Sequence, residues 1–94
     1  MKISRKDEVN LPEFSSHEEA RNFFKEKYGE SFMLTGTDMI DDRKIYFYSL
    51  VLDKKAFNEG QEKLQKGEPV TGFDFINSYQ PIEIFEDGNI HIIH

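Results

Sequence analysis

The chain contains no cysteine, and this absence excludes disulfide bonds, thiolate metal sites and cysteine nucleophiles. The sequence also lacks any apolar run that approaches the length of a transmembrane helix. Residues 1–10 carry five charged side chains and no apolar stretch that could act as a secretory signal. Together these absences predict a protein of a reducing compartment, and we expect it in the cytoplasm, without membrane contact.

Basic residues are missing from the last third of the chain. Residues 67–94 contain no Lys or Arg but five acidic residues, which carry −5 of the formal net charge of −6. The five acids are Glu68, Asp74, Glu83, Glu86 and Asp87, and Phe73, Phe75, Tyr79 and Phe85 are interleaved with them. Aromatic rings can stack on bases, but this charge repels phosphate. We therefore expect no nucleic-acid partner.

The sequence does contain a large supply of aromatic side chains. A chain of 94 residues can hold a single hydrophobic core, and nine Phe and four Tyr supply that core with large rings. We therefore expect one compact α+β domain over residues 11–94. A poorly ordered segment is expected before it, over residues 1–10, because the composition there is polar.

Two helices are predicted from capping residues and apolar spacing. Ser15 or Ser16 can cap the first helix, because each has a glutamate three residues later, and Gly29 ends it. Asp53 can cap the second helix. Gly60 lies on the apolar stripe of this second helix, and a glycine at such a position suggests close packing against the sheet.

Four strands are predicted at residues 32–40, 44–52, 81–86 and 89–93. Turn residues at 41–43 and the Asp87-Gly88 pair favour two hairpins, whereas residues 70–80 are expected to form a loop with some extended structure. The element order is α-β-β-α-β-β. It predicts a four-stranded antiparallel sheet with both helices packed on one face.

The polar residues contain no catalytic or metal-binding motif. His91 and His94 form a His-x-x-His pattern, but residues three apart on a strand point to opposite faces, so we expect no metal site. The aspartates near residue 41 lack the spacing of a calcium loop, and no serine lies in a nucleophile elbow. We assign no catalytic residue and no cofactor, and the sequence favours a role other than catalysis.

The acidic, aromatic C-terminal third leads to the first functional hypothesis. We expect a small acidic binding module, of the inhibitor, immunity or regulator kind, that docks a basic protein partner. The candidate contact residues are Phe73, Asp74, Phe75, Tyr79, Glu83, Phe85, Glu86 and Asp87. The competing interpretation is that these acids form a solvated face without a partner.

The length of the 70–80 loop leads to an alternative hypothesis, a small-molecule binder or small enzyme with a pocket beside that loop. Its candidate polar liners are Tyr46, Tyr48, Asp74, Asn77 and Tyr79. A sheet that is covered on one face also has a second face and two edges to protect. Both a monomer and a homodimer are therefore compatible with the sequence.

Overall fold

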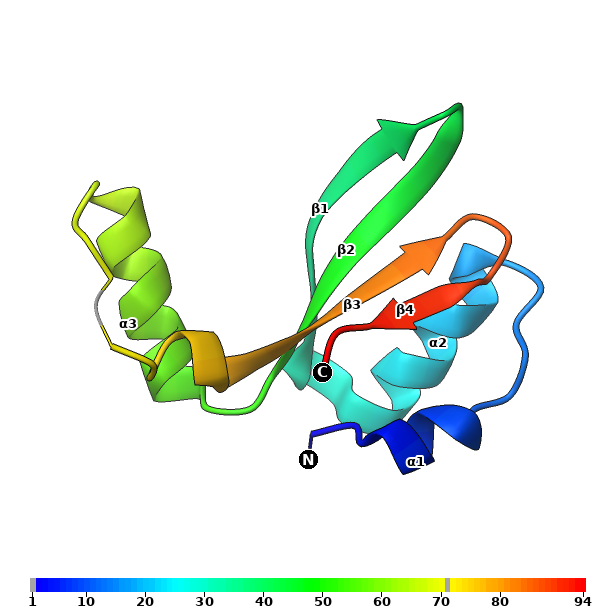
Figure 1. The fold of residues 1–94 in the computed structure, drawn as a ribbon, viewed down its shortest axis with the longest axis horizontal. Coiled ribbons are helices and arrows are strands. Elements are labelled where there is room, and N and C mark those ends of the chain that lie inside the picture. Colours follow the sequence, from blue (N-terminus) through cyan, green and yellow to red (C-terminus); the bar gives the residue numbers. More distant parts are fainter. Residues whose placement is uncertain (1, 71) are drawn as a thin grey trace.

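The computed structural model describes residues 2–70 and 72–94 and shows an α+β fold, as predicted (Figure 1). Its helices are α1 (Arg5–Val9), α2 (His17–Tyr28) and α3 (Lys54–Gln65), with the short 3-10 helices η1 (Gly29–Ser31) and η2 (Ile76–Ser78). Its strands are β1 (Phe32–Ile40), β2 (Arg43–Val51), β3 (Tyr79–Phe85) and β4 (Ile90–Ile92).

The strands form one antiparallel sheet in the order β1-β2-β3-β4, which confirms the predicted four-stranded antiparallel sheet. β1 and β2 are joined by Asp41 and Asp42, whose φ angles of 50° and 63° are both positive, as a two-residue hairpin turn requires. The second predicted hairpin is also present, and Gly88 in its loop has a φ of 92°. β3 begins at Tyr79, two residues earlier than predicted, because its first residues pair with the end of β2.

α2 matches the first predicted helix. Its cap is Ser16, the second of the two candidate serines, whose hydroxyl accepts a hydrogen bond of 3.1 Å from the Glu19 amide. Gly29 follows the helix with a φ of 59°. The side of α2 that faces the sheet buries Ala20 and Phe24, so the apolar spacing of this helix correctly identified its packing face.

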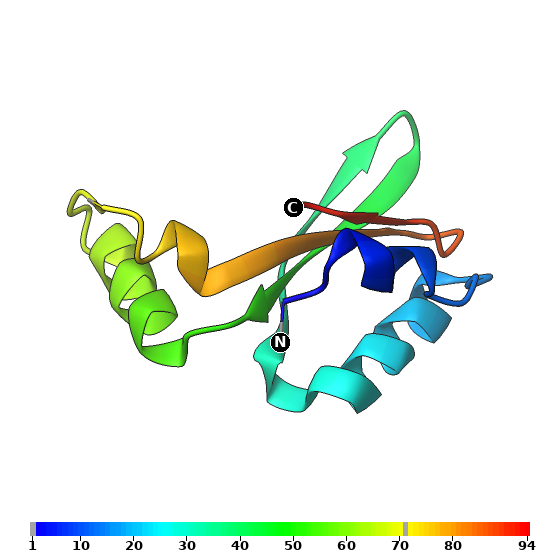
Figure 2. The same cartoon turned by 60° about the horizontal axis from the view of Figure 1, so that its bottom comes forward.

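The core lies between α2 and one face of the sheet (Figure 2). Because side chains alternate between the two faces of a strand, the even-numbered residues of β2 and β3 point to this face. Tyr48, Leu50 and Ile82 are all buried there. The Phe32 ring stacks on Tyr48 with centroids 4.4 Å apart and on Phe24 of α2 with centroids 5.2 Å apart.

The start of the chain is part of this core, although its polar composition led us to expect a poorly ordered segment over residues 1–10. Ile3 is only 1% exposed. Its amide donates to the side-chain oxygen of Gln80 and its carbonyl accepts from the side-chain nitrogen of Gln80, both at 2.9 Å. Ser4 and Asp7 then form a capping box that begins α1. The polar composition of this segment does not reveal the contact, because the partner of its one buried apolar residue lies 77 residues away in the sequence.

α3 does not lie beside α2, which corrects the prediction that both helices pack on one face. It stands at the end of the sheet, away from α2 (Figure 2). Its Phe57 contacts Phe75 and Tyr79, with ring centroids 6.0 and 5.5 Å apart. Gly60 lies against the ring of Phe75, not against the sheet as its position suggested. The apolar stripe of α3 is short, and side chains just before and at the start of β3 cover it.

This placement of α3 makes the molecule extended. The radius of gyration is 14.1 Å, whereas a compact chain of this length has a value of about 12 Å. The face of the sheet opposite α2 is consequently left without a helix lying flat on it. We call this face the open face.

Candidate functional site

The open face carries three of the eight predicted contact residues. Tyr79, Glu83 and Phe85 occupy alternate positions of β3 and are partly buried, and their odd numbering places them opposite the α2 face. Phe75 lies beside them, because its ring contacts that of Tyr79 at a centroid distance of 5.4 Å. The strand alternation thus brings a carboxylate and aromatic side chains to one uncovered surface.

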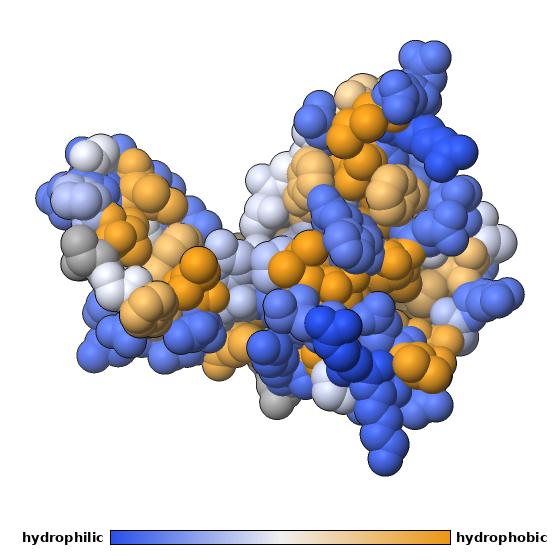
Figure 3. Space-filling model, in the orientation of Figure 1, coloured by the Kyte–Doolittle hydropathy of each residue, from blue (hydrophilic) through white to orange (hydrophobic). Residues whose placement is uncertain are grey.

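A groove separates α3 from the open face, and we call it the α3 groove (Figure 3). Its volume is about 470 Å³. The sheet side is formed by Thr35, Phe47, Ser49, Pro81, Glu83 and Ile93, and the other side by Phe57, Gln61, Leu64, Phe75 and Tyr79. Figure 3 shows apolar surface on both the α3 lobe and the sheet lobe that flank the hollow. The shape and apolar walls suit a side chain or short segment of another molecule.

Glu83 is the only ionisable carboxylate among the described residues that line the α3 groove. Its side chain is 28% exposed, and the Nδ1 atom of His91 on β4 lies 2.8 Å from its Oε1. His91 is far more exposed, at 63%. A cation arriving in the groove would therefore meet a carboxylate that is partly shielded from water, where charge interactions are stronger than in bulk solvent.

A second hollow, which we call the acidic recess, lies at the other end of β3. Asp42, Arg43, Phe85, Glu86 and Asp87 surround its volume of about 300 Å³. Residues at both hairpin turns, which are more than forty residues apart in sequence, border this hollow, so three acids and a single arginine line it. Asp87 also stabilises its own turn by accepting hydrogen bonds from the Asn89 amide and side chain, both at 3.0 Å.

Two of the eight predicted contact residues lie apart from the others. Phe73 is 78% exposed and lies outside both the α3 groove and the acidic recess. Asp74 borders a different hollow, together with Lys55 and Lys63 of α3. Because these lysines offset its charge, Asp74 adds little to an acidic surface. The candidate surface therefore narrows to Phe75, Tyr79, Glu83, Phe85 and the two acids of the β3–β4 loop.

The five side chains proposed for a pocket beside the 70–80 loop do not all line one hollow, although Asn77 and Tyr79 share one. Tyr46 and Tyr48 lie on the α2 face, opposite Tyr79, because their positions on β2 alternate with those of the open face. Asp74 and Asn77 are exposed and border separate hollows. The sequence suggested these residues as neighbours in space but could not show to which face each one points.

Tyr46 and Tyr48 instead enclose His17, which the sequence did not distinguish from an ordinary surface histidine. The His17 ring stacks on Tyr46 with a centroid distance of 3.4 Å, and its Nε2 lies 2.7 Å from the Tyr48 hydroxyl. Burial, followed by the charge of Arg21, lowers the pKa of His17. Burial also raises the pKa of Tyr48. Both shifts favour a neutral imidazole that accepts a hydrogen bond from the protonated Tyr48 hydroxyl. This contact lies at the edge of the core and is structural.

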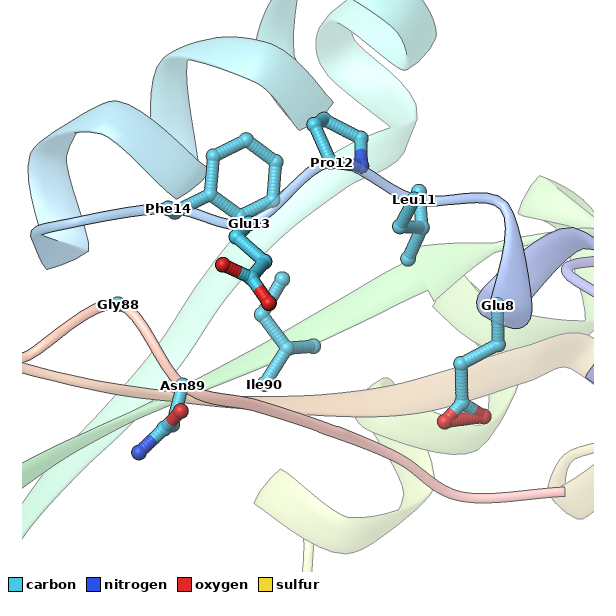
Figure 4. Close-up of a pocket in the computed structure, with 8 residues that line it drawn as sticks. All are labelled: Glu8, Leu11, Pro12, Glu13, Phe14, Gly88, Asn89 and Ile90. Atoms are coloured by element: carbon cyan, nitrogen blue, oxygen red, sulfur yellow. The ribbon is translucent and has the colours of Figure 1, made fainter.

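A further hollow lies between the segment before α2 and the β3–β4 hairpin (Figure 4). Its volume is about 390 Å³, and Glu8, Leu11, Glu13, Phe14 and Ile90 are among the residues that line it. In Figure 4 the Glu13 side chain extends toward Ile90. Glu8 is already engaged, because the Nε2 atom of His94 lies 2.6 Å from its carboxylate. The described residues that line this hollow include carboxylates but neither a nucleophile nor a cationic group.

The two histidines of the His-x-x-His pattern lie in separate contacts. His91 contacts Glu83 and His94 contacts Glu8, so these two histidines pair with carboxylates on different parts of the surface. Among residues 2–70 and 72–94 no group of three or more His, Asp or Glu side chains is arranged to hold a metal ion. None of the helices described by the structure is long and apolar enough to cross a membrane.

Sequence reasoning missed the residues that α3 and β2 contribute to the groove. Phe57 and Leu64 belong to the apolar stripe of α3, which the periodicity detected but assigned to the core. Comparison of the chain with known proteins finds no matching family model, no matching curated protein and no matching solved structure.

Proposed function

We propose that this protein is a small docking module that binds a basic, partly apolar segment of another protein along the open face of β3. The observation that carries the proposal is the arrangement of Tyr79, Glu83 and Phe85 on one uncovered face, between an apolar groove and an acidic recess. In this binding mode apolar anchors of the partner enter the α3 groove and its cations meet Glu83 and the acids of the recess. Protein interfaces typically combine buried apolar anchors with charged residues at the rim.

The dimensions of β3 set the length of the segment that fits. Tyr79 and Phe85 are six residues apart, and a strand rises about 3.3 Å per residue, so the two hollows are about 20 Å apart. An extended segment of about six to eight residues would reach both. The charge pattern supports a protein partner and disfavours nucleic acid. A cytoplasmic location, which the cysteine-free composition favours, is part of the same proposal.

Selection of random peptides against the immobilised protein tests the proposal. We expect the enriched peptides to combine Lys or Arg with large apolar residues. Their affinity should weaken as salt rises from low to high concentration, because charge interactions at a surface are screened. Enrichment of acidic peptides, or binding that does not change with salt, would contradict the proposal.

Three variants separate the charged from the apolar part of the site. Glu83→Gln should weaken peptide binding by about 5- to 30-fold, since it removes a partly buried charge pair worth about 1–2 kcal/mol. Leu64→Ser should weaken binding while leaving the salt dependence intact, because Leu64 is 53% exposed and forms an apolar wall of the groove. The matched control is Glu26→Gln, which removes an equal charge from the exposed side of α2. If Glu26→Gln has the same effect as Glu83→Gln, the open face is not the binding site.

A further inference from the structure

The outer edge of β1 is the longest unpaired strand edge that the structure describes. β1 spans nine residues and stands first in the strand order, so β2 is its only strand neighbour among the described residues. β4, at the opposite edge, has only three residues. The loop that precedes β4 is covered by the segment before α2, where Gly88 lies against the Phe14 carbonyl. Only one of the two edges is therefore short and covered.

β1 lacks most of the features that prevent one strand edge from pairing with another. Proteins protect such edges with Lys, Pro, bulges or short strands, and β1 contains neither Lys nor Pro. Its single charged residue is Asp38. Among the described residues, nine large hydrophobic side chains are exposed, and four of them lie on this strand: Met33, Leu34, Met39 and Ile40, at 42–60% exposure. Figures 1 and 2 show that the β1–β2 hairpin projects beyond β3 and β4.

A β-bulge between Leu34 and Gly36 interrupts β1, and it determines which pairing of two such strands is possible. Before the bulge, Phe32 and Leu34 lie opposite the even-numbered residues of β2; after it, Thr37 and Met39 do so. Even-numbered residues of β1 therefore point to the α2 face before the bulge, and odd-numbered residues point to it after the bulge. Directly opposite residues of an antiparallel pair must point to the same face, and the longest register of two β1 strands that meets this condition pairs residues whose numbers add up to 71.

This register pairs the apolar residues Phe32 and Met39 and keeps the charges apart. It gives three pairs on each side of a twofold axis at the bulge: Phe32 with Met39, Met33 with Asp38, and Leu34 with Thr37. The two Asp38 side chains are then five residues apart along the pair, about 17 Å, which exceeds the distance of about 8 Å over which salt screens charges. No like charges face one another in this arrangement.

We propose that two copies of this chain form a homodimer by antiparallel pairing of their β1 strands, which joins the two sheets into one of eight strands. A second copy fits this edge because the bulge near the middle of β1 makes the strand complementary to itself about a twofold axis. The contact is one strand edge with three half-exposed apolar side chains per copy, Met33, Leu34 and Met39, which is the small end of specific interfaces. We therefore expect association in the micromolar range. This inference does not depend on the α3 groove.

Sedimentation of the full chain over about 1 to 300 µM measures the dimer directly. We expect the fraction of dimer to rise with concentration. Met39→Lys should raise the dissociation constant at least about tenfold, because it buries a charge at the new pair. The control is Val9→Lys, since Val9 is 83% exposed on α1, and its effect should stay below about twofold. A chain that stays monomeric throughout, or a dimer that Met39→Lys does not weaken, would overturn the proposal.

Cysteine cross-linking tests the register itself, and the cysteine-free chain provides a clean background. Opposite residues in an antiparallel pair have Cα atoms about 4.5–5.5 Å apart, which is within the span of a disulfide. The double variant Leu34→Cys with Thr37→Cys should therefore give a covalent dimer under mild oxidation, whereas either single variant should give little. Equal cross-linking by a single variant would exclude this register, and the result does not depend on whether Met39→Lys folds.

Discussion

Gln80 holds the start of the chain in the core, and replacing it with Leu should free that segment. The Gln80 side chain donates to and accepts from the backbone of Ile3 at 2.9 Å, and it donates to the Ile93 carbonyl at 3.3 Å. A leucine has a similar volume but offers no hydrogen bonds. Gln80→Leu therefore leaves an amide and at least one carbonyl without partners at a position that is 1% exposed.

The expected loss of stability follows from two competing responses. If the segment stays in place, two unpaired buried polar groups cost about 1–3 kcal/mol each. If it detaches into water, the protein loses the burial of Ile3, which contributes about 1.5–3 kcal/mol. The less costly response dominates, so we expect Gln80→Leu to lower the free energy of unfolding by about 2–3 kcal/mol with the segment detached.

Urea unfolding measures the free energy, and limited trypsin digestion reports the detachment. In Gln80→Leu, cleavage after Arg5 and Lys6 should become fast while the remainder of the chain stays protected. Gln65→Leu is the matched control, because Gln65 is exposed on α3, and it should leave both readouts unchanged. A Gln80→Leu variant with the stability of the parent protein, or with an intact N-terminal segment, would refute this account of the contact.

Two other residues give predictions of definite sign. Gly60→Ala normally stabilises a helix by about 0.5–1 kcal/mol, but here the new methyl would lie 2.7 Å from Cε1 of Phe75 and closer still to other ring atoms. We therefore expect a loss of about 1–2 kcal/mol in urea unfolding, whereas the exposed Asn58→Ala should be neutral or stabilising; equal gains for both would show that the ring does not pack there. His17 has a lowered pKa in the folded state, so its contribution is complete above the unfolded pKa of about 6.5 and is lost as pH falls below that value. His17→Gln keeps an acceptor for Tyr48, and the difference in stability between parent and variant should shrink as pH falls from 7.5 to about 5; a difference that stays constant with pH would contradict this.

The elements of the fold could be predicted because their signals are local. A cap three residues before a glutamate, an alternating apolar run and an Asp-Gly pair depend only on near neighbours in the chain. For this reason α2, the two hairpins and the antiparallel sheet agree with the sequence. The misplaced features all depend on distant contacts: Ile3 needs Gln80, and α3 needs Phe75 and Tyr79.

The candidate site was predictable in composition but not in geometry. The acidic and aromatic character of residues 67–94 is a property of the sequence, and Tyr79, Glu83 and Phe85 share a face because the alternation along a strand is regular. Phe73 and Asp74 are also an aromatic and an acidic residue, yet they lie outside the α3 groove and the acidic recess. They precede β3, in a turn region where no periodicity relates one side chain to the next.

By itself, then, the amino-acid sequence determined the class of fold, the hairpins and the charge of the C-terminal third, because each of these follows from neighbouring residues. Only the tertiary structure decided that α2 and the N-terminal segment cover one face of the sheet and that α3 leaves a groove beside the open face. It also decided that the bulge in β1 sets the pairing of its exposed edge. The reason is physical: an amphipathic helix or an apolar strand specifies that a surface must be covered, but which surface covers it depends on packing across the whole chain.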